Sequence, residues 1–445
     1  MINRSISGIR GLADSDLSRE FIKSAASGAH QLLNPGVIFV GRDPRPSGSD
    51  ISDYFIQTLL SFGRDVIEVG IAPTPTIQFM TASTDAAGGI VVTASHNPSE
   101  WNGLKFITKD GTFFDSELCG RLFQLMDTGI SIPKAQDRGL HLPDQNSIQR
   151  HIIHIVSLKC INTKAIRSRN YKIVVDAVNG AGSEAIPHLL ESLGCEVIRL
   201  NCETDLDFPR SPEPLPKNIT DLCSAVIESG ADAGFALDPD GDRLAIVSDK
   251  GIPLSEEYTL VMAADGYLAE NSSNKYIVTN LSTTLALEKI ADQHGSMVKR
   301  TPIGEIHVVN KMKELESELG GEGNGGVILS ENHYGRDALV ASALVLHRMT
   351  QTDKPLSEWF QSLPQFKMVK DRIELGDFNP EELFTKAKIV FKNAIIDSQD
   401  GLKFTWDDRW IHIRISNTEP IMRIYSEGPT KEIAQNLANK VKDII

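Results

Sequence analysis

The chain has 445 residues, more than one hydrophobic core ordinarily organises, so the sequence predicts several domains. A formal net charge of −14 argues against a nucleic-acid or anionic-membrane surface, but it leaves room for a small anionic substrate held by local cations. The sequence has no signal-peptide core and no run of the roughly 18 apolar residues that a membrane helix needs. We therefore expect a cytoplasmic enzyme.

The cysteines form no C-x-x-C pair and no spacing typical of a zinc site. An odd, scattered set predicts reduced thiols that pack in the interior or lie at the surface. The five are Cys119, Cys160, Cys195, Cys202 and Cys223.

Three consecutive segments share one order of predicted elements, in which β runs alternate with helical stretches. Apolar runs bounded by Gly, Pro, Asn and Asp are typical of strands buried on both faces, and the alternation predicts mostly parallel sheets. The runs cover 37–40, 65–70 and 89–98, then 172–180, 196–200 and 232–243, then 276–280, 297–304 and 325–331. The segments are alike in element order rather than in letters, so a triplicated domain and three unrelated α/β domains both stay open.

The C-terminal part follows another pattern. Strands are expected at 368–375, 410–415 and 421–428, with helices at 380–391 and 430–445, which is typical of a small α+β domain. Residues 352–365 contain two prolines and are expected to be a linker. The predicted domains are 1–145, 146–250, 251–362 and 363–445, arranged around a central cleft.

The loop TASHNP (93–98) follows the third β run of the first segment, where ligands gather in a parallel sheet. Ser95 beside His96 could be a nucleophile at a strand end. The alternative is a turn in which both side chains bond to nearby backbone. Lys105, one strand-turn further on, could balance phosphate charge or transfer a proton.

The loop DPDGDR (238–243) places Asp238, Asp240 and Asp242 on one face of an extended segment. Three carboxylates at this spacing suit Mg²⁺ better than Zn²⁺, and they repel one another unless a cation lies between them. An EF-hand is excluded, because its twelfth position would be Asp249 rather than glutamate. The alternative is a solvated acidic turn.

The loop GGEGNGGV (320–327) offers Glu322 and Asn324 to sugar hydroxyls, while its glycines allow close approach. It lacks the Gly-Lys-Ser/Thr of a phosphate-binding P-loop. Taken alone, the pattern is only a Gly-rich loop.

The segment RISNTEPIMR (414–423) combines two guanidinium groups with hydroxyls and backbone N–H groups, a set that suits a phosphate dianion. The alternative is a polar hairpin turn. The candidate phosphate-binding residues are Arg414, Ser416, Asn417, Thr418 and Arg423.

These motifs, in this order, resemble the α-D-phosphohexomutases, which include phosphoglucomutase, phosphomannomutase and phosphoglucosamine mutase. The resemblance covers essentially the whole chain, and SGIRG (7–11) and GRDPRPSG (41–48) also resemble family signatures. It implies three similar α/β domains with mixed, mostly parallel sheets plus a C-terminal α+β domain. TASHNP and DPDGDR are the most specific of the motifs.

The resemblance also implies residue roles. Ser95 would carry the phosphoryl group, and Asp238, Asp240 and Asp242 would hold Mg²⁺ together with a phosphoserine oxygen. Arg10, His96, Lys105 and Arg243 would surround the transferring group, Gly304, Glu305, Glu322 and Asn324 would contact the sugar, and the C-terminal loop would bind the distal phosphate. A hexose 1,6-bisphosphate would be the intermediate and activator.

Two departures from the family pattern concern the sugar. Glu305 and His307 are not arranged as in the best-known phosphomannomutase/phosphoglucomutase type, and Gly326 lies where many bacterial members carry a histidine. The combination of GEGNGGV with GRDA (335–338) resembles a branch often assigned to glucosamine phosphate. Glucose and mannose phosphates stay open as alternatives.

Two rival functions are a phosphoserine-dependent phosphatase and a non-catalytic sugar-phosphate binding protein. The separate phosphate-binding segment argues against the first, and the combination of Ser95 with three aspartates argues against the second. The expected partner is a small sugar phosphate, with no nucleic acid and no membrane, and the chain is expected to be a monomer or a homodimer.

Overall fold

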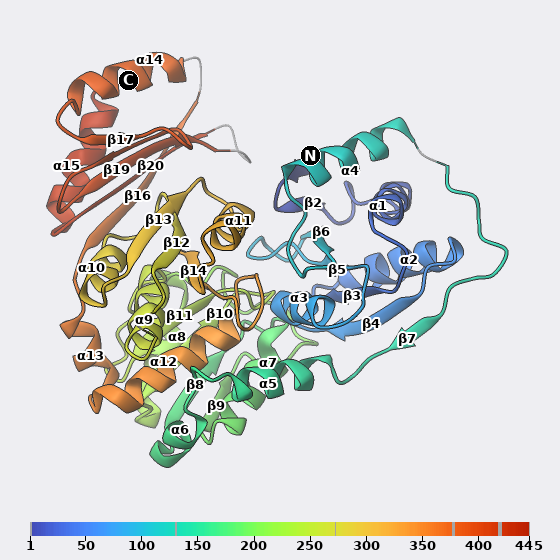
Figure 1. Cartoon of the computed structure of the whole chain (residues 1–445), viewed down its shortest axis with the longest axis horizontal. Coiled ribbons are helices and arrows are strands. Elements are labelled where there is room, and N and C mark those ends of the chain that lie inside the picture. Colours follow the sequence, from blue (N-terminus) through green and yellow to red (C-terminus); the bar gives the residue numbers. More distant parts are fainter. Residues whose placement is uncertain (1, 130, 272, 376–378, 417–420, 445) are drawn as a thin grey trace.

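The computed structural model of the chain describes residues 2–129, 131–271, 273–375, 379–416 and 421–444. It contains four sheets, which follow one another along the chain (Figure 1). The C-terminal sheet (red) lies beside the third unit and away from the N-terminal unit (blue). No helix in the described ranges is long and apolar enough to cross a membrane.

The first unit has a seven-stranded sheet of order β1-β2-β6-β5-β3-β4-β7. Its strands are β1 (Asn3–Ser5), β2 (Gly8–Leu12), β3 (Ile38–Arg42), β4 (Val66–Ile71), β5 (Gly88–Val92), β6 (Trp101–Thr108) and β7 (His141–Pro143). Its helices are α1 (Arg19–Leu32), α2 (Gly48–Ser61), α3 (Thr74–Ala82) and α4 (Ser116–Thr128).

The second unit has a four-stranded sheet of order β11-β10-β8-β9. Its strands are β8 (Lys172–Asp176), β9 (Glu196–Leu200), β10 (Ala233–Leu237) and β11 (Leu244–Ser248). Its helices are α5 (Ser147–Ser157), α6 (Thr163–Arg169), α7 (Gly182–Ser192) and α8 (Thr220–Ser229), with a short 3₁₀ turn at Pro216–Asn218.

The third unit has a sheet of order β13-β12-β14-β15. Its strands are β12 (Tyr276–Asn280), β13 (Met297–Thr301), β14 (Leu319–Glu322) and β15 (Gly326–Leu329). Its helices are α9 (Glu257–Leu268), α10 (Ala286–Gln293), α11 (Glu305–Leu315), α12 (Ala338–Thr352) and α13 (Leu356–Ser362).

The three units repeat one strand order: β6-β5-β3-β4, β11-β10-β8-β9 and β15-β14-β12-β13. In each, three strands are parallel and the fourth returns antiparallel, so the expected mixed, mostly parallel sheets are confirmed. The run expected at 325–331 as a third parallel strand is instead the antiparallel β15. The third parallel strand is β14, whose sequence LGGE hides it because glycine has little β propensity.

The fourth unit is an antiparallel sheet of order β16-β20-β19-β18-β17, as expected for an α+β domain. Its strands are β16 (Lys367–Glu374), β17 (Ile395–Asp397), β18 (Leu402–Thr405), β19 (Trp410–Ile415) and β20 (Ile421–Gly428), and its helices are α14 (Pro380–Val390) and α15 (Lys431–Lys442). The linker expected at 352–365 is wrong in part, because α13 fills half of it with Pro355 as its N-cap.

The hydrophobic cores explain how the units are held. Every residue of β5, β10 and β14 is buried, as expected for central strands covered on both faces. One continuous core joins the second and third units, from Ile152 through the buried α9 and α12 to Leu363. The fourth unit has a separate core. The domain limits at 145, 250 and 362 stay predictions.

Candidate active site

Ser95 lies in the loop that follows β5, and this loop contacts the second unit. Its φ of 51° is in the left-handed region that a non-glycine residue seldom adopts, so the surroundings must hold it there. The Oγ of Ser95 lies 3.2 Å from Asp238 Oδ2 and 3.4 Å from His96 Nδ1. The side chain is buried, at 1% exposure.

The loop GRDPRPSG supplies what holds Ser95. Asp43 accepts hydrogen bonds from Thr93 Oγ1 at 2.5 Å and from Arg45 Nε at 2.9 Å. Arg45 in turn donates to the backbone carbonyl of Ser95, and Ser95 N donates to Thr93 Oγ1 at 2.9 Å. This buried Asp43–Arg45 pair therefore supports the strained turn. The sequence singled out its loop as a family signature but not these two residues.

The three aspartates follow β10 and are all buried, so the loop is not the solvated acidic turn that the sequence left open as an alternative. Burial, and then the charges of Asp242 and Asp240, raise the pKa of Asp238 well above its usual range. Burial alone would also raise the pKa of Asp240, but the charge of Lys105 and hydrogen bonds from Lys105 and Thr74 outweigh burial and hold that pKa low.

The triplet fits a hard cation. Its ligand oxygens lie within 4.8 Å of one another. The buried Oδ1 atoms of Asp240 and Asp242 accept no hydrogen bond from any residue that the structure describes. Buried carboxylate oxygens left without donors are costly, and Mg²⁺ binds such oxygens.

Four cationic or polar side chains cover this buried centre. Lys105 Nζ lies 2.6 Å from Asp240 Oδ2 and 3.6 Å from Asp242 Oδ2. Arg243 Nε lies 3.6 Å from Asp242 Oδ1 and 3.8 Å from Asp238 Oδ2. Burial lowers the pKa of Arg10 to about 10. Burial also lowers the pKa of His96 well below its usual value, and the positive charges of Arg243 and Arg10 lower it further. His96 is therefore neutral at pH 7.

These four side chains line a cleft of about 490 Å³. Other predicted residues that line it are Gly304, Glu305, Glu322, Asn324, Arg414, Ser416 and Arg423. Ser95 and the three aspartates are not among the lining residues, but Ser95 contacts His96, and Asp240 and Asp242 contact Lys105, which do line the cleft. The loops of all four units thus meet at one cavity, as expected.

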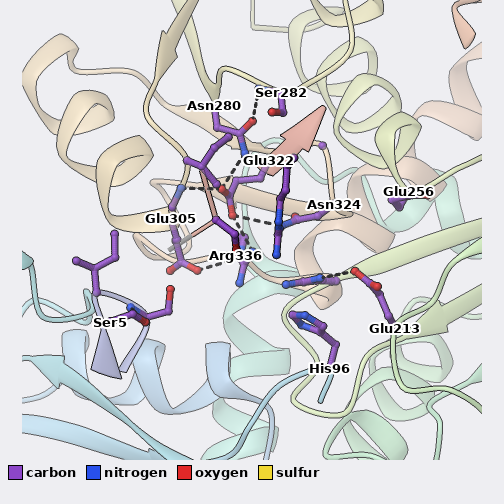
Figure 2. A pocket seen from close by; sticks show the side chains of 18 of the residues that line it. Ser5, His96, Glu213, Glu256, Asn280, Ser282, Glu305, Glu322, Asn324 and Arg336 are labelled. Atoms are coloured by element: carbon purple, nitrogen blue, oxygen red, sulfur yellow. Dashed lines mark hydrogen bonds and ion pairs between the residues drawn. The ribbon is translucent and has the colours of Figure 1, made fainter. Parts of the chain in front are cut away.

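Arg336 is among the residues of this cleft that sequence reasoning missed. Figure 2 shows it between Glu305 and Glu322, and its guanidinium lies 2.9 Å from Glu305 Oε2 and 2.7 Å from Glu322 Oε2. A third contact, 2.6 Å long, reaches Asp242 Oδ2. Arg336 therefore connects the aspartate loop (238–243) with the glycine-rich loop (320–327) and with the start of α11. It lies in the segment GRDA, and a lone basic residue there carries no spacing signal.

The space that Arg336 occupies exists because residue 326 is glycine. A Cβ at Gly326 would lie 2.2 Å from Cδ of Arg336, closer than real contacts allow. Glu322 also accepts a hydrogen bond from Asn280 Nδ2 at 2.8 Å, so both Asn280 and Arg336 fix the position of its carboxylate.

Burial raises the pKa of Glu305 to about 7, and the charge of Arg336 opposes that rise. Gln78 Nε2 of α3 donates to Glu305 Oε1 at 3.4 Å, which brings the first unit into contact with this group. Glu305 begins α11 directly after Gly304, whose φ of 129° suits glycine.

The predicted phosphate-binding segment comes from β19 and β20. Arg414 and Arg423 are directly opposite each other in the antiparallel pair, which places two guanidinium groups at one end of the sheet. Asp400 Oδ2 lies 3.1 Å from Arg414 Nε and accepts from Ile303 N at 3.1 Å, so it joins the fourth unit to the third. Asn417 and Thr418 lie outside the described residues.

Comparisons with known proteins agree with this geometry. Sequence models of the phosphoglucomutase/phosphomannomutase α/β/α domains I, II and III and of the C-terminal domain match residues 3–130, 149–251, 255–366 and 379–444. The chain belongs to the phosphoglucomutase/phosphomannomutase family. The resemblance seen in the sequence is confirmed, and with it the class of enzyme, an isomerase of the phosphohexomutase type.

Relatives in this family match nearly end to end. A phosphoglucomutase/phosphomannomutase from Thermococcus kodakarensis is 36% identical over 438 residues, or 96% of this chain and 95% of that protein. A protein from Methanopyrus kandleri named probable phosphoglucosamine mutase is 31% identical over 99% of this chain and 96% of its own. The crystal structure of a family protein from Burkholderia thailandensis has a TM-score of 0.86 at 25% identity and covers 100% of this chain and 97% of its own.

Proposed function

We propose that the chain interconverts hexose 1-phosphate and hexose 6-phosphate through a phosphoserine at Ser95 and a hexose 1,6-bisphosphate intermediate. The observation that carries the proposal is the 3.2 Å approach of Ser95 Oγ to Asp238, at the centre of a buried carboxylate triplet. In a phosphohexomutase, a hydroxyl in this position would exchange its phosphoryl group with the sugar.

Asp238, Asp240 and Asp242 would hold Mg²⁺, together with an oxygen of the phosphoserine. When bound, Mg²⁺ would offset negative charge on the phosphoryl oxygens. The two orphaned Oδ1 atoms of the triplet support this ligand set.

Arg10, Lys105 and Arg243 would stabilise the charge that develops on the transferring group. Lys105 Nζ is 2.6 Å from Asp240 and lines the cleft, so it can also pass a proton to or from a sugar hydroxyl. His96 is neutral and can position Ser95 Oγ through its Nδ1.

The sugar would lie between Gly304, Glu305, Glu322 and Asn324, and its distal phosphate would bind Arg414, Ser416, Arg423 and the loop with Asn417 and Thr418. The bisphosphate must turn around between the two transfers, so one phosphate site serves both orientations. A closed cleft would exclude water and limit hydrolysis of the phosphoserine.

For the sugar we propose glucosamine phosphate, with glucose and mannose phosphates as alternatives. The GEGNGG loop and relatives named phosphoglucosamine mutase support the first, and the Thermococcus kodakarensis protein named phosphoglucomutase/phosphomannomutase supports the second. The deciding measurement is a comparison of kcat/KM for the three sugar 1-phosphates with catalytic hexose 1,6-bisphosphate present.

The same experiment distinguishes the rival functions. The proposal expects the 6-phosphate isomer to form with little free phosphate, and it expects a chelator to stop turnover and Mg²⁺ to restore it. Release of free phosphate at the rate of substrate loss would indicate a phosphatase, and binding without conversion of any of the three sugars would indicate a binding protein.

A further inference from the structure

A second group of metal-ligating side chains lies behind the cleft. His151 belongs to α5, His333 follows β15, and Asp337 is the N-cap of α12. The Nε2 atoms of His151 and His333 lie 3.2 Å and 3.4 Å from Asp337 Oδ2. All three side chains are at most 3% exposed, and their potential ligand atoms lie within 4.8 Å of one another.

The imidazole nitrogens are not accounted for by hydrogen bonds. Within the described ranges, His333 Nδ1 has no hydrogen-bond partner, and the Nε2 atoms of His151 and His333 have no well-formed hydrogen bond beyond their shared contact with Asp337 Oδ2. Nearly every buried polar atom in a folded protein has one, because leaving it without a partner costs about 1–3 kcal/mol. Two imidazole Nε2 atoms therefore converge on one carboxylate oxygen that already accepts from Asn332 Nδ2, a crowded arrangement that a cation between the three groups would satisfy.

The surroundings orient the three groups. Thr76 Oγ1 of α3 lies 3.1 Å from His151 Nδ1. With the proton on Nδ1 donated to Thr76, the lone pair of the ring is on Nε2, the nitrogen that faces Asp337. Asn332 Nδ2 donates to Asp337 Oδ2 at 2.6 Å, and Leu339 N donates to Asp337 Oδ1 at 2.8 Å. Phe79 stacks on His151 with ring centroids 4.8 Å apart.

We propose that His151, His333 and Asp337 bind a structural Zn²⁺ ion through Nε2, Nε2 and Oδ2. Zinc bonds to nitrogen and oxygen are about 2.0–2.2 Å long, so neighbouring ligand atoms of a tetrahedral ion lie about 3.3–3.5 Å apart, close to the two distances seen here. Two imidazoles and one carboxylate suit Zn²⁺, whereas the all-oxygen aspartate triplet suits Mg²⁺. The fourth position is left to water.

The proposed ion would stabilise the loop that carries Arg336. Arg336, which contacts Asp242, Glu305 and Glu322, lies between His333 and Asp337 in the chain. An ion bound to both neighbours fixes the loop that presents Arg336. It also joins this loop to α5 and, through Thr76, to the first unit. The Zn²⁺ would thus stabilise the position of the Arg336 loop relative to the first unit, which carries Ser95.

The test uses Co²⁺ as a spectroscopic probe on the full chain. The chain is stripped with a chelator, saturated with Mg²⁺ to fill the aspartate triplet, and titrated with Co²⁺. We expect one Co²⁺ per chain with the strong visible bands of four-coordinate, imidazole-bound cobalt. Asp337→Asn keeps a side-chain acceptor at the N-cap of α12 but loses the negative charge. Loss of a residue that only orients a metal ligand lowers metal affinity by about 10–100-fold, so loss of a ligand itself should lower Co²⁺ affinity by more than about 100-fold.

His188→Ala is the matched control. His188 lies partly exposed on α7, away from the proposed ligands, so its loss should leave the titration unchanged. Zn²⁺ should also raise the thermal midpoint of the original chain but not of Asp337→Asn. A colourless Co²⁺ titration of the original chain would overturn the proposal, even if the variant does not fold. So would an Asp337→Asn variant that keeps the bands.

Discussion

Ser95 Oγ and Asp238 Oδ2 lie 3.2 Å apart although 143 positions separate the two residues in the chain. A second contact of the same kind joins Thr74 Oγ1 to Asp240 Oδ2 at 2.7 Å. The ends of β5 and β10 in different sheets therefore converge on one point. The candidate active site lies at the interface of the first and second units, so its geometry depends on how these units dock.

Replacing Ser95 by alanine should remove turnover and spare sugar-phosphate binding. The residue is the proposed phosphoryl carrier, and loss of a nucleophile costs at least about 10³-fold in kcat. Conversion of hexose 1-phosphate is measured by a coupled assay, binding by calorimetry, and phosphorylation by intact mass. Ser99→Ala, in the same loop but outside the cleft, is the control. Full turnover of Ser95→Ala would contradict the phosphoserine mechanism.

Adding one methyl group at residue 326 should weaken sugar binding. In Gly326→Ala the new Cβ would lie 2.2 Å from Arg336 Cδ, so the guanidinium must move away from Asp242 and Glu322. We expect kcat/KM to fall about tenfold or more, since loss of a charge-assisted hydrogen bond costs about 1.5–3 kcal/mol. Steady-state kinetics measure the effect.

Gly120→Ala is the matched control, because nothing lies within 4 Å of a Cβ at that helical position. Alanine is favoured over glycine in a helix by about 1 kcal/mol, so this variant should be active and slightly more stable. Equal kinetics for the two variants would show that Arg336 is not held by the glycine.

The buried carboxyl of Glu305 should make stability depend on pH. Burial raises its pKa from the usual 4.5 to about 7, so between these values the folded chain binds a proton that the unfolded chain does not. Stability therefore falls as pH rises through this window, by up to about 3 kcal/mol from this one group. Glu257, whose pKa burial also raises to about 7, adds to the same trend.

Glu305→Gln removes one of these two contributions. Its thermal midpoint relative to that of the original chain should rise as pH goes from about 5 to about 8. Differential scanning calorimetry at several pH values measures the difference. A constant difference across this range would mean that Glu305 is not buried as a protonatable carboxyl.

Asp400 should matter for the affinity of the distal phosphate. It holds Arg414 and the backbone of Ile303, so Asp400→Ala frees an arginine that the cleft needs in one position. We expect KM to rise about tenfold with kcat little changed, because the lost interaction serves ground-state and transition-state binding alike. Asp408→Ala, which removes an exposed ion pair with Arg409, should change neither constant, and an equal KM for both variants would contradict this role.

The sequence by itself determined the family and the class of enzyme, and it predicted which side chains react. Each of the motifs TASHNP and DPDGDR is a short continuous stretch of the chain. A turn or a metal-binding loop needs its side chains at a fixed short spacing, so the candidate residues could be named from the sequence. Buried β runs likewise predicted the sheets. The glycine-rich β14 escaped, because a short strand with weak propensity acquires its structure from its neighbours. The antiparallel strands β6 and β11 were not predicted either, and the run that forms β15 was expected to be parallel.

Only the tertiary structure decided which distant residues support those loops. Arg336, the Asp43–Arg45 pair and the cluster of His151, His333 and Asp337 join segments up to 186 positions apart, and no local spacing connects them. Their contacts arise from the docking of units whose buried surfaces resemble any other core. Short-range patterns encode the reacting groups, whereas the positions of those groups are set by long-range packing that a linear sequence does not display.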